Sequence, residues 1–138
     1  MKSLSEFRVG DTFRAERACD PYRPLYYAAV SGDYNPIHID PEAGRRAGRD
    51  GVILHGLCTF SWLAEACAGY FDHPRRVAKL EARFARPVAV GDTVRFEGRC
   101  ERVEGRRVRV LVTVVNQHGE EVLKNAAAEG VIGEGGRP

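Results

Sequence analysis

An apolar helical segment followed by strands of alternating polarity is the pattern that most constrains the fold of this chain. The segment from Gly56 to Tyr70 is apolar on most sides and rich in small residues, which is typical of a helix buried on nearly every face. Such small side chains would let a sheet curve closely over the helix. From Arg76 onward the apolar residues recur at every second position, the periodicity of a strand with one buried face.

Four strands are expected in this second half of the chain. The alternation is clearest over residues 80–84, 94–100 and 108–114, and a last strand extends from about Glu121 to Ile132. The turns between these strands are predicted at Gly91-Asp92, Glu104-Gly105 and His118-Gly119. Because helices come first and strands follow, we predict the α+β class, with the strands forming an antiparallel meander that buries one face.

The N-terminal part predicts a strand and then a helix. Residues 7–13 are expected to form a short strand interrupted by a turn at Gly10-Asp11. Asp20 is predicted as the N-cap and Pro21 as the first residue of a helix that ends at Gly32.

The spacing of three apolar residues predicts which face of this helix is buried, namely Leu25, Ala28 and Ala29. A second short helix repeats the same starting signal, with Asp40 as the N-cap and Pro41 at the first position. It is predicted to end near Gly48.

The composition is that of an ordinary globular protein. A length of 138 residues predicts a single domain covering residues 1–138, with a flexible tail at 133–138. Hydrophobic residues make up 43% and charged residues 29%, which argues against disorder. The formal net charge of +2 gives little support to nucleic-acid binding. Since no segment has transmembrane length and the first residues lack a signal peptide, we expect a cytoplasmic protein that binds neither membranes nor nucleic acid.

The four cysteines show no pattern of a metal site. Cys19, Cys58, Cys67 and Cys100 contain no CxxC pair and no zinc spacing with a histidine. We therefore predict four reduced thiols and no metal, with Cys58 and Cys67 packing as small hydrophobes inside the apolar helix.

The chemistry of the chain is concentrated in residues 31–38, SGDYNPIH. Alone, Asp33 suits a helix end or a turn, and His38 suits an ordinary loop. A straight helix would point these two side chains apart, but a loop curled about Asn35-Pro36 would bring them together. A carboxylate and an imidazole held on one loop suit general acid–base catalysis near neutral pH. Asn35 is predicted to order the loop by hydrogen-bonding its backbone.

A second cluster, His55-Gly56, begins the apolar helix. The first amides of a helix have no partner within it and lie at the positive end of its dipole. A glycine there lets a substrate carbonyl approach the amide, as in an oxyanion hole for an enolate. The alternative is a glycine needed only for tight packing. His55 is expected to have a structural rather than a catalytic role.

Other reaction classes find less support. No GxSxG motif surrounds a serine, and no glycine-rich phosphate loop begins a helix. The arginines between residues 83 and 109 are expected to form a solvated face of the sheet. Among them, Arg83 and Arg86 are the candidates for binding the phosphates of a carrier.

The segment Ser31-Gly32-Asp33-Tyr34-Asn35-Pro36-Ile37-His38, together with His55-Gly56 at a helix start, resembles the MaoC-like hydratases and dehydratases. These include R-specific enoyl-CoA hydratases and 3-hydroxyacyl-ACP dehydratases. The resemblance covers nearly the whole chain and extends to the Val9-Gly10-Asp11 start and the Phe84–Val88 strand end. It implies a single hot-dog domain, in which an antiparallel sheet wraps around a long central helix.

The resemblance also implies roles for the candidate site residues. Asp33 and His38 would form the acid–base pair that adds water to a trans-2-enoyl thioester, and the Gly56 amide would hold the thioester oxygen. Asn35 and His55 would order the loop and the substrate. No cofactor is implied beyond the carrier, CoA or acyl carrier protein.

The chain departs from the family pattern at one position. Some relatives have a serine where this chain has Ala64, so the water or the acyl chain would be held differently. Trp62 and Tyr70-Phe71 are candidates for shaping an acyl pocket.

The resemblance also implies an oligomer. This would be a homodimer joined edge to edge through its sheets, or a heterodimer with a related subunit lacking catalytic residues.

Two alternatives remain on the same fold. One is a non-catalytic acyl-CoA-binding subunit or sensor, which would have no use for the Asp33–His38 pair. The other is a thioesterase, which would attack the thioester carbonyl rather than the β-carbon. One fold can host all three activities.

Overall fold

The computed structural model describes residues 1–133, and the strands within that range form one antiparallel sheet of five. The strands are β1 (Thr12–Ala18), β2 (Val77–Phe84), β3 (Thr93–Glu104), β4 (Arg107–Val115) and β5 (Glu121–Val131). The α-helices are α1 (Arg23–Ser31), α2 (Pro41–Arg46) and α3 (Gly56–Tyr70), and the short 3-10 helices are η1 (Leu4–Glu6), η2 (Pro36–His38) and η3 (Pro74–Arg76). Of the tail predicted to be flexible, residues 134–138 lie outside the described part of the chain.

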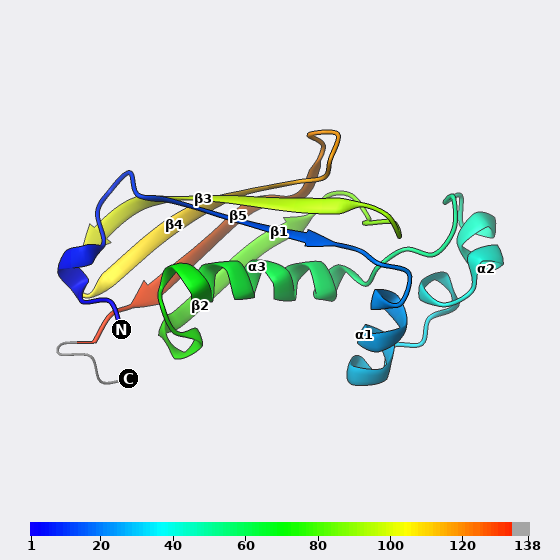
Figure 1. Ribbon diagram of the computed structural model, residues 1–138, viewed down its shortest axis with the longest axis horizontal. Coiled ribbons are helices and arrows are strands. Elements are labelled where there is room, and N and C mark those ends of the chain that lie inside the picture. The colour runs from blue at the N-terminus through cyan, green and yellow to red at the C-terminus, as the bar shows by residue number, and fades with distance from the viewer. Residues whose placement is uncertain (134–138) are drawn as a thin grey trace.

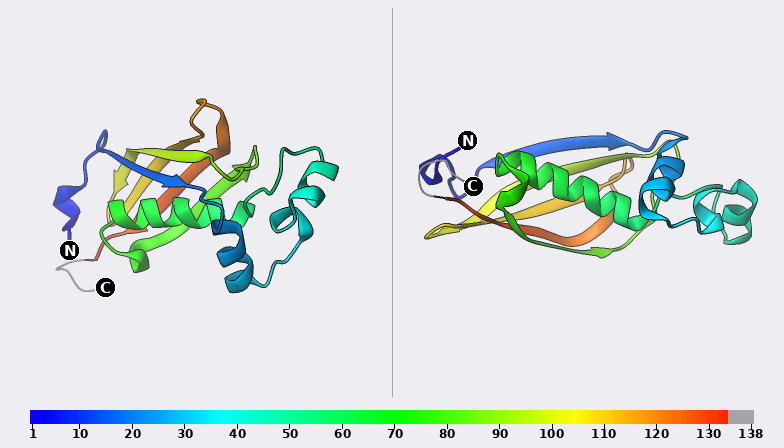
Figure 2. Two further views of the ribbon diagram at one scale, coloured as in Figure 1. Left: turned by 45° about the vertical axis from the view of Figure 1, so that its right-hand side comes forward. Right: turned by 90° about the horizontal axis from the view of Figure 1, so that it is seen from below.

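Helix α3 lies along one face of the sheet, and α1 and α2 lie beyond its N-terminal end (Figure 1; Figure 2). This arrangement is the hot-dog fold, so the predicted α+β class and the predicted central helix are confirmed, the helix with the predicted bounds. The alternation is also confirmed in β3 and β4, whose buried residues are Val94, Phe96, Cys100, Val108, Val110, Val112 and Val114. These side chains form one hydrophobic cluster with Leu63 and Cys67 of α3.

The prediction that α3 is buried on nearly every face is wrong for one stripe. Leu57, Ser61 and Glu65 are exposed at every fourth position, and Leu57 is 61% exposed. The reason is that the sheet covers only one side of the helix. The apolar Leu57 therefore faces away from the core in the single chain.

The strand order differs from the predicted meander. β3, β4 and β5 do form consecutive antiparallel pairs, but β2 pairs with β5 rather than with β3, and β1 pairs with β3. The two edges of the sheet are therefore β1 and β2. Alternation along a sequence reveals which face of a strand is buried, but not which strand lies beside it.

The first strand begins later than predicted. Residues 8–11 form a tight turn, in which the Asp11 carboxylate accepts from the Arg8 amide at 2.8 Å and Gly10 has a φ of +95°. Strand β1 follows this turn instead of containing it. Its charged residues, including Arg14 and Glu16, hide the strand pattern in the sequence.

Helix α1 begins at Arg23 rather than at Pro21. The Asp20 carboxylate accepts from the amides of Tyr22 and Arg23, at 2.8 and 3.0 Å, and so forms a turn ahead of the helix. The predicted buried face is right only for Ala28, because Leu25 and Ala29 are exposed and Pro24 is buried in their place.

The start of helix α2 agrees with the prediction. The Asp40 carboxylate caps it by accepting from the Glu42 amide at 2.9 Å, and Pro41 is its first residue. The helix ends at Arg46, two residues before Gly48.

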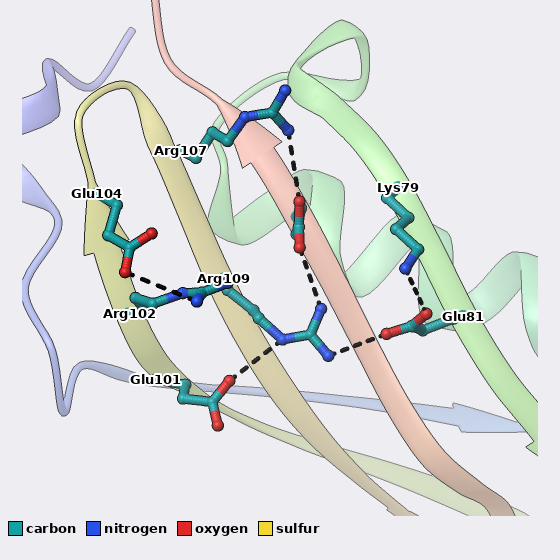
Figure 3. Close-up of polar contacts among 8 residues, drawn as sticks. Lys79, Glu81, Glu101, Arg102, Glu104, Arg107 and Arg109 are labelled. Carbon is teal, nitrogen blue, oxygen red and sulfur yellow. Dashed lines mark hydrogen bonds and ion pairs between the residues drawn. The ribbon is translucent and has the colours of Figure 1, made fainter.

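The arginines of the sheet are more closely paired than a solvated face requires. Arg109 of β4 contacts three carboxylates, those of Glu81, Glu101 and Glu129, at 2.9 to 3.2 Å (Figure 3). Hydrogen bonds from Lys79 and Arg109 hold the pKa of Glu81 below its ordinary value. This network lies on the face of the sheet opposite α3. The guanidinium of Arg109 is occupied by its three carboxylate partners.

The four cysteines are free and buried, so their thiols are expected to react slowly with disulfide reagents in the native protein. Burial raises the pKa of Cys19 and of Cys67 from 9.0 to about 12. Only the thiolate reacts with disulfide reagents, so the native protein should label slowly at pH 8, whereas denatured protein should label at all four thiols. Because folding favours the protonated thiols of Cys19 and Cys67, the contribution of these two to stability should be full below pH 9.0 and fall as the pH rises towards 12. Rapid labelling of native protein would contradict this prediction.

Among the helices that the structure describes, none has the length and apolar character needed to cross a membrane.

Candidate active site

The loop after α1 is shaped by a series of side-chain-to-backbone hydrogen bonds. Gly32 ends the helix with a φ of +75°, a conformation that favours glycine. The Ser31 hydroxyl accepts from the Asp33 amide at 3.2 Å, and the Asp33 carboxylate accepts from the Asn35 amide at 3.1 Å. The Asn35 side-chain oxygen then accepts from the Ile37 amide at 3.3 Å. This is the loop-ordering contact expected of Asn35, and it leads directly into η2, which ends at His38.

The loop brings Asp33 and His38 together. His38 Nε2 lies 3.9 Å from Asp33 Oδ2. The ring of His38 is buried, whereas the Asp33 side chain is 54% exposed. On its other side, His38 Nδ1 lies 2.8 Å from the Ile53 carbonyl oxygen. Because a carbonyl can only accept, Nδ1 carries the proton, and the Nε2 lone pair faces the carboxylate. His38 is thus oriented as a base.

The segment 53–55 is bound to this loop by three hydrogen bonds. Besides the contact to His38, the Ile53 amide donates to the Ile37 carbonyl at 3.1 Å. His55 Nε2 lies 2.8 Å from the Asp33 carbonyl oxygen. The rings of His38 and His55 stack with centroids 3.8 Å apart and planes inclined by 22°. The Ile53 and His55 contacts could not be predicted from the sequence, because they join residues 15 and 22 positions apart.

The Gly56 amide is positioned as the sequence suggested. Gly56 is the first residue of α3, and within residues 1–133 its N–H has no hydrogen-bond partner. A Cβ at this position would lie 3.1 Å from the Phe84 ring. Glycine therefore lets the Phe84 ring pack closely against the start of α3, which is the packing role considered for this glycine from the sequence.

A cavity of about 260 Å³ lies beside His38 and Gly56, and Asp33 is not among its lining residues. His38 and Gly56 line it together with apolar residues, and Arg86 lies at its wall. The other lining residues are Ile53, Leu54, Thr59, Phe84, Ala85, Pro87, Val88, Val122 and Leu123. Thr59 and Phe84 were missed as site residues from the sequence, where Thr59 was indistinguishable from any helical threonine. The cavity has an apolar body and few polar groups, which is typical of a small-molecule site.

The two candidate phosphate ligands lie on different faces. Arg86 lines the cavity, and its guanidinium is 3.4 Å from Glu120. Arg83 lines a hollow on the outer face of the sheet beside Arg99 and Arg109. The reason is the alternation of a strand: Phe84 points to the cavity, so its neighbour Arg83 points to the other face. Only Arg86 remains a candidate for contact with a carrier bound at this cavity.

The residues considered for an acyl pocket do not line this cavity. Trp62, Tyr70 and Phe71 are buried in the hydrophobic core. Ala64 lines a separate, open hollow along α3 that includes Ala68. That hollow is larger than the cavity at Gly56 and is also lined by Asp72 and His73. The Asp72 carboxylate contacts the N-terminal amine and the Lys2 amide, and within the described residues no ion pair joins it to His73.

Three side chains could be considered as metal ligands, because donor atoms of Asp33, His38 and His55 lie within 4.8 Å of one another. Zinc needs lone pairs that converge on one point about 2.0–2.2 Å away. Two of the four ring nitrogens, His38 Nδ1 and His55 Nε2, contact carbonyl oxygens instead. We assign no metal to this cluster.

An aromatic side chain of α1 lies beside the histidine pair. The Tyr27 ring centroid lies 4.9 Å from that of His55. Burial, and to a lesser degree the charge of Asp33, raises the pKa of Tyr27 above its ordinary value. An uncharged phenol therefore packs against His55 at neutral pH.

A hot-dog fold with an aspartate–histidine loop facing the N-terminus of the central helix defines the class of this protein. The MaoC like domain family matches residues 7–122, and the chain belongs to this family. It is 38% identical over 108 residues to mouse peroxisomal multifunctional enzyme type 2, covering 77% of this chain and 14% of that protein. It is 37% identical over 113 residues to peroxisomal enoyl-CoA hydratase 2 of Arabidopsis thaliana, covering 78% of this chain and 34% of that protein.

A solved structure shows the same fold at nearly the same length. R-hydratase PhaJ1 from Pseudomonas aeruginosa superposes with a TM-score of 0.87 at 28% identity, covering 96% of this chain and 86% of that one. The curated relatives are longer: this chain spans only 14% and 34% of the length of the two named above.

Proposed function

We propose that this chain is a hydro-lyase that reversibly hydrates trans-2-enoyl thioesters to R-3-hydroxyacyl thioesters. The observation that carries this proposal is the His38–Asp33 pair, 3.9 Å apart, with His38 lining a cavity that Gly56 also lines. The names of the relatives, enoyl-CoA hydratase 2 and R-hydratase, support the reaction type and the R configuration.

The spacing of the pair suits a bridging water. A gap of 3.9 Å is too long for a direct hydrogen bond, and one water would join both groups. His38 Nε2 takes a proton from this water as the water oxygen bonds to the β-carbon of the substrate. The electrons of the double bond move to the α-carbon and the thioester oxygen, giving an enolate. Asp33 starts the cycle protonated and delivers the proton that completes the α-carbon. The proton that His38 took from the water then passes to the Asp33 carboxylate through a second water across the 3.9 Å gap, which restores both groups.

The Gly56 amide stabilises the enolate. Its N–H lies at the positive end of the α3 dipole, and negative charge develops on the thioester oxygen only as the reaction proceeds. A donor placed there strengthens its hydrogen bond in the transition state. In the reverse direction the same groups remove water from the R-3-hydroxyacyl thioester.

The test compares three activities of the purified wild-type chain. Hydration of a short enoyl-CoA should remove the ultraviolet absorbance of the enoyl thioester, and chiral chromatography should show the R product. Release of free CoA from saturated acyl-CoA would instead indicate a thioesterase. Binding of acyl-CoA with neither reaction would indicate a non-catalytic subunit. Either of the last two results, without hydration of CoA or acyl-carrier-protein substrates, would contradict the proposal.

The carrier is proposed to contact Arg86. Arg86→Gln should raise KM for an enoyl-CoA about fivefold with kcat retained, equivalent to about 1 kcal/mol for an exposed charge pair. The matched control is Arg83→Gln, on the opposite face of the same strand end. An N-acetylcysteamine thioester, which lacks phosphates, should show no difference between Arg86→Gln and wild type. An equal change in KM for both substrates would remove Arg86 from the carrier site.

A homodimer is proposed for the assembly. Strand β2 is an edge of the sheet, so its outer backbone groups are free to pair with the same strand of a second copy. A heterodimer with a related subunit is the alternative. Light scattering coupled to size exclusion distinguishes a dimer of this chain from a monomer awaiting a partner.

A further inference from the structure

His55 occupies the N-cap position of α3 without capping it. Its side chain makes no hydrogen bond to the first turn of the helix, although capping is the usual reason for a polar side chain there. The side chain instead turns towards the loop, where Nε2 contacts the Asp33 carbonyl oxygen at 2.8 Å. Because a carbonyl only accepts, Nε2 carries the proton.

The other ring nitrogen has no partner. Nδ1 of His55 is buried without a hydrogen bond within the described residues, and the residue as a whole is 2% exposed. A buried acceptor without a donor is unfavourable for folding. Stability alone therefore does not account for an imidazole at this position, since a side chain with only the Nε2-like donor would avoid this loss.

The contact of His55 joins the two halves of the site. Asp33 belongs to the loop that carries the acid–base pair, and Gly56, the next residue after His55, carries the free amide. Of the three hydrogen bonds between this segment and the loop, the one from His55 is the one that reaches Asp33 itself and so links Asp33 to the residue before the amide. The stacked ring of His38, 3.8 Å away, is held in the same unit.

We propose that His55 is a positioning residue for the proposed hydration, acting on Asp33 through its backbone carbonyl rather than on the substrate. This inference rests on the proposed function and deepens it. It requires a proton on Nε2 of the ring, and it predicts an effect on turnover more than on substrate binding.

Two substitutions to amide side chains distinguish the roles of the two ring nitrogens of His55. In His55→Gln the amide nitrogen can occupy the place of Nε2 and donate to the Asp33 carbonyl. In His55→Asn the shorter side chain places its amide near Nδ1 and cannot reach that carbonyl. The expected result is that His55→Gln keeps kcat within about threefold of wild type, whereas His55→Asn loses about 10- to 100-fold, with KM changed less than about threefold in both.

His55→Phe is the third variant, because it keeps a stacked ring and removes the donor. It should lose kcat as His55→Asn does, and it keeps the test valid if His55→Asn does not fold. Thermal unfolding of each variant gives the control for stability. Equal kcat in the Gln variant and in the variants without the donor, or a loss that appears only in KM, would overturn the inference. Wild-type protein without hydration activity would instead overturn the proposed function, and the inference with it.

Discussion

Asp33→Asn and His38→Asn should each lower kcat/KM for hydration by about 10²–10⁴-fold, the usual contribution of a general acid or base. Both changes preserve the loop. The carboxamide of Asp33→Asn can still accept from the Asn35 amide, which the carboxylate does at 3.1 Å. In His38→Asn the amide nitrogen takes the place of Nδ1 and can still donate to the Ile53 carbonyl, while the base at Nε2 is lost.

The double variant sharpens this prediction. If the two groups act on one water, the combined loss should be close to that of the more damaging single change, because groups that act as a unit are not additive. Asp50→Asn is the matched control, an exposed aspartate between α2 and α3. Steady-state kinetics with one enoyl-CoA compare the wild type with the two single variants, the double variant and the Asp50→Asn control. Hydration that survives both substitutions would sink the proposed mechanism.

The second large effect is on folding. Leu63→Ala should lower the free energy of unfolding by about 2–5 kcal/mol, the usual cost of emptying a fully buried leucine site. Leu63 is 0% exposed and lies on the face of α3 that meets the sheet. The loss combines the transfer of the missing atoms from water with the cavity that remains in a core packed from several strands.

Leu57→Ala is the control on the same helix with the same chemistry. Leu57 is 61% exposed, so its loss should change the free energy of unfolding by less than about 0.5 kcal/mol. Urea denaturation measures both, at a protein concentration low enough to report the monomer. A large loss for Leu57→Ala under dimer-forming conditions alone would show that a second chain covers this residue. Equal losses in the monomer would contradict the assignment of the buried face.

The contribution of the charged network around Arg109 to stability can be compared with that of the core leucine. Arg109 has three carboxylate partners, yet these groups lie at a surface where water weakens each pair. We therefore expect the core leucine, rather than this charged network, to dominate the stability of the sheet and helix.

The sequence by itself determined the elements with strong local signals. The bounds of α3 follow from a continuous apolar run, and the start of α2 follows from Asp40 and Pro41. The buried valines of β4 follow from strict alternation. These signals are local, because side chains two, three or four positions apart share a face of a strand or a helix. The aspartate–histidine loop could be predicted for the same reason, since Asn35-Pro36 forces a turn between residues only five apart.

The tertiary structure alone decided what depends on distant segments. It placed β2 beside β5, left Leu57 exposed, and sent Arg83 and Arg86 to opposite faces. It also brought His55 to the Asp33 carbonyl and Ile53 to His38. Periodicity specifies which face of an element is apolar, whereas the partner of that face depends on packing that is cooperative over the whole chain. Asp33, His38 and Gly56 could therefore be named as candidates from the sequence, but the other residues that line the cavity and the hydrogen bonds that hold the loop in place required the fold.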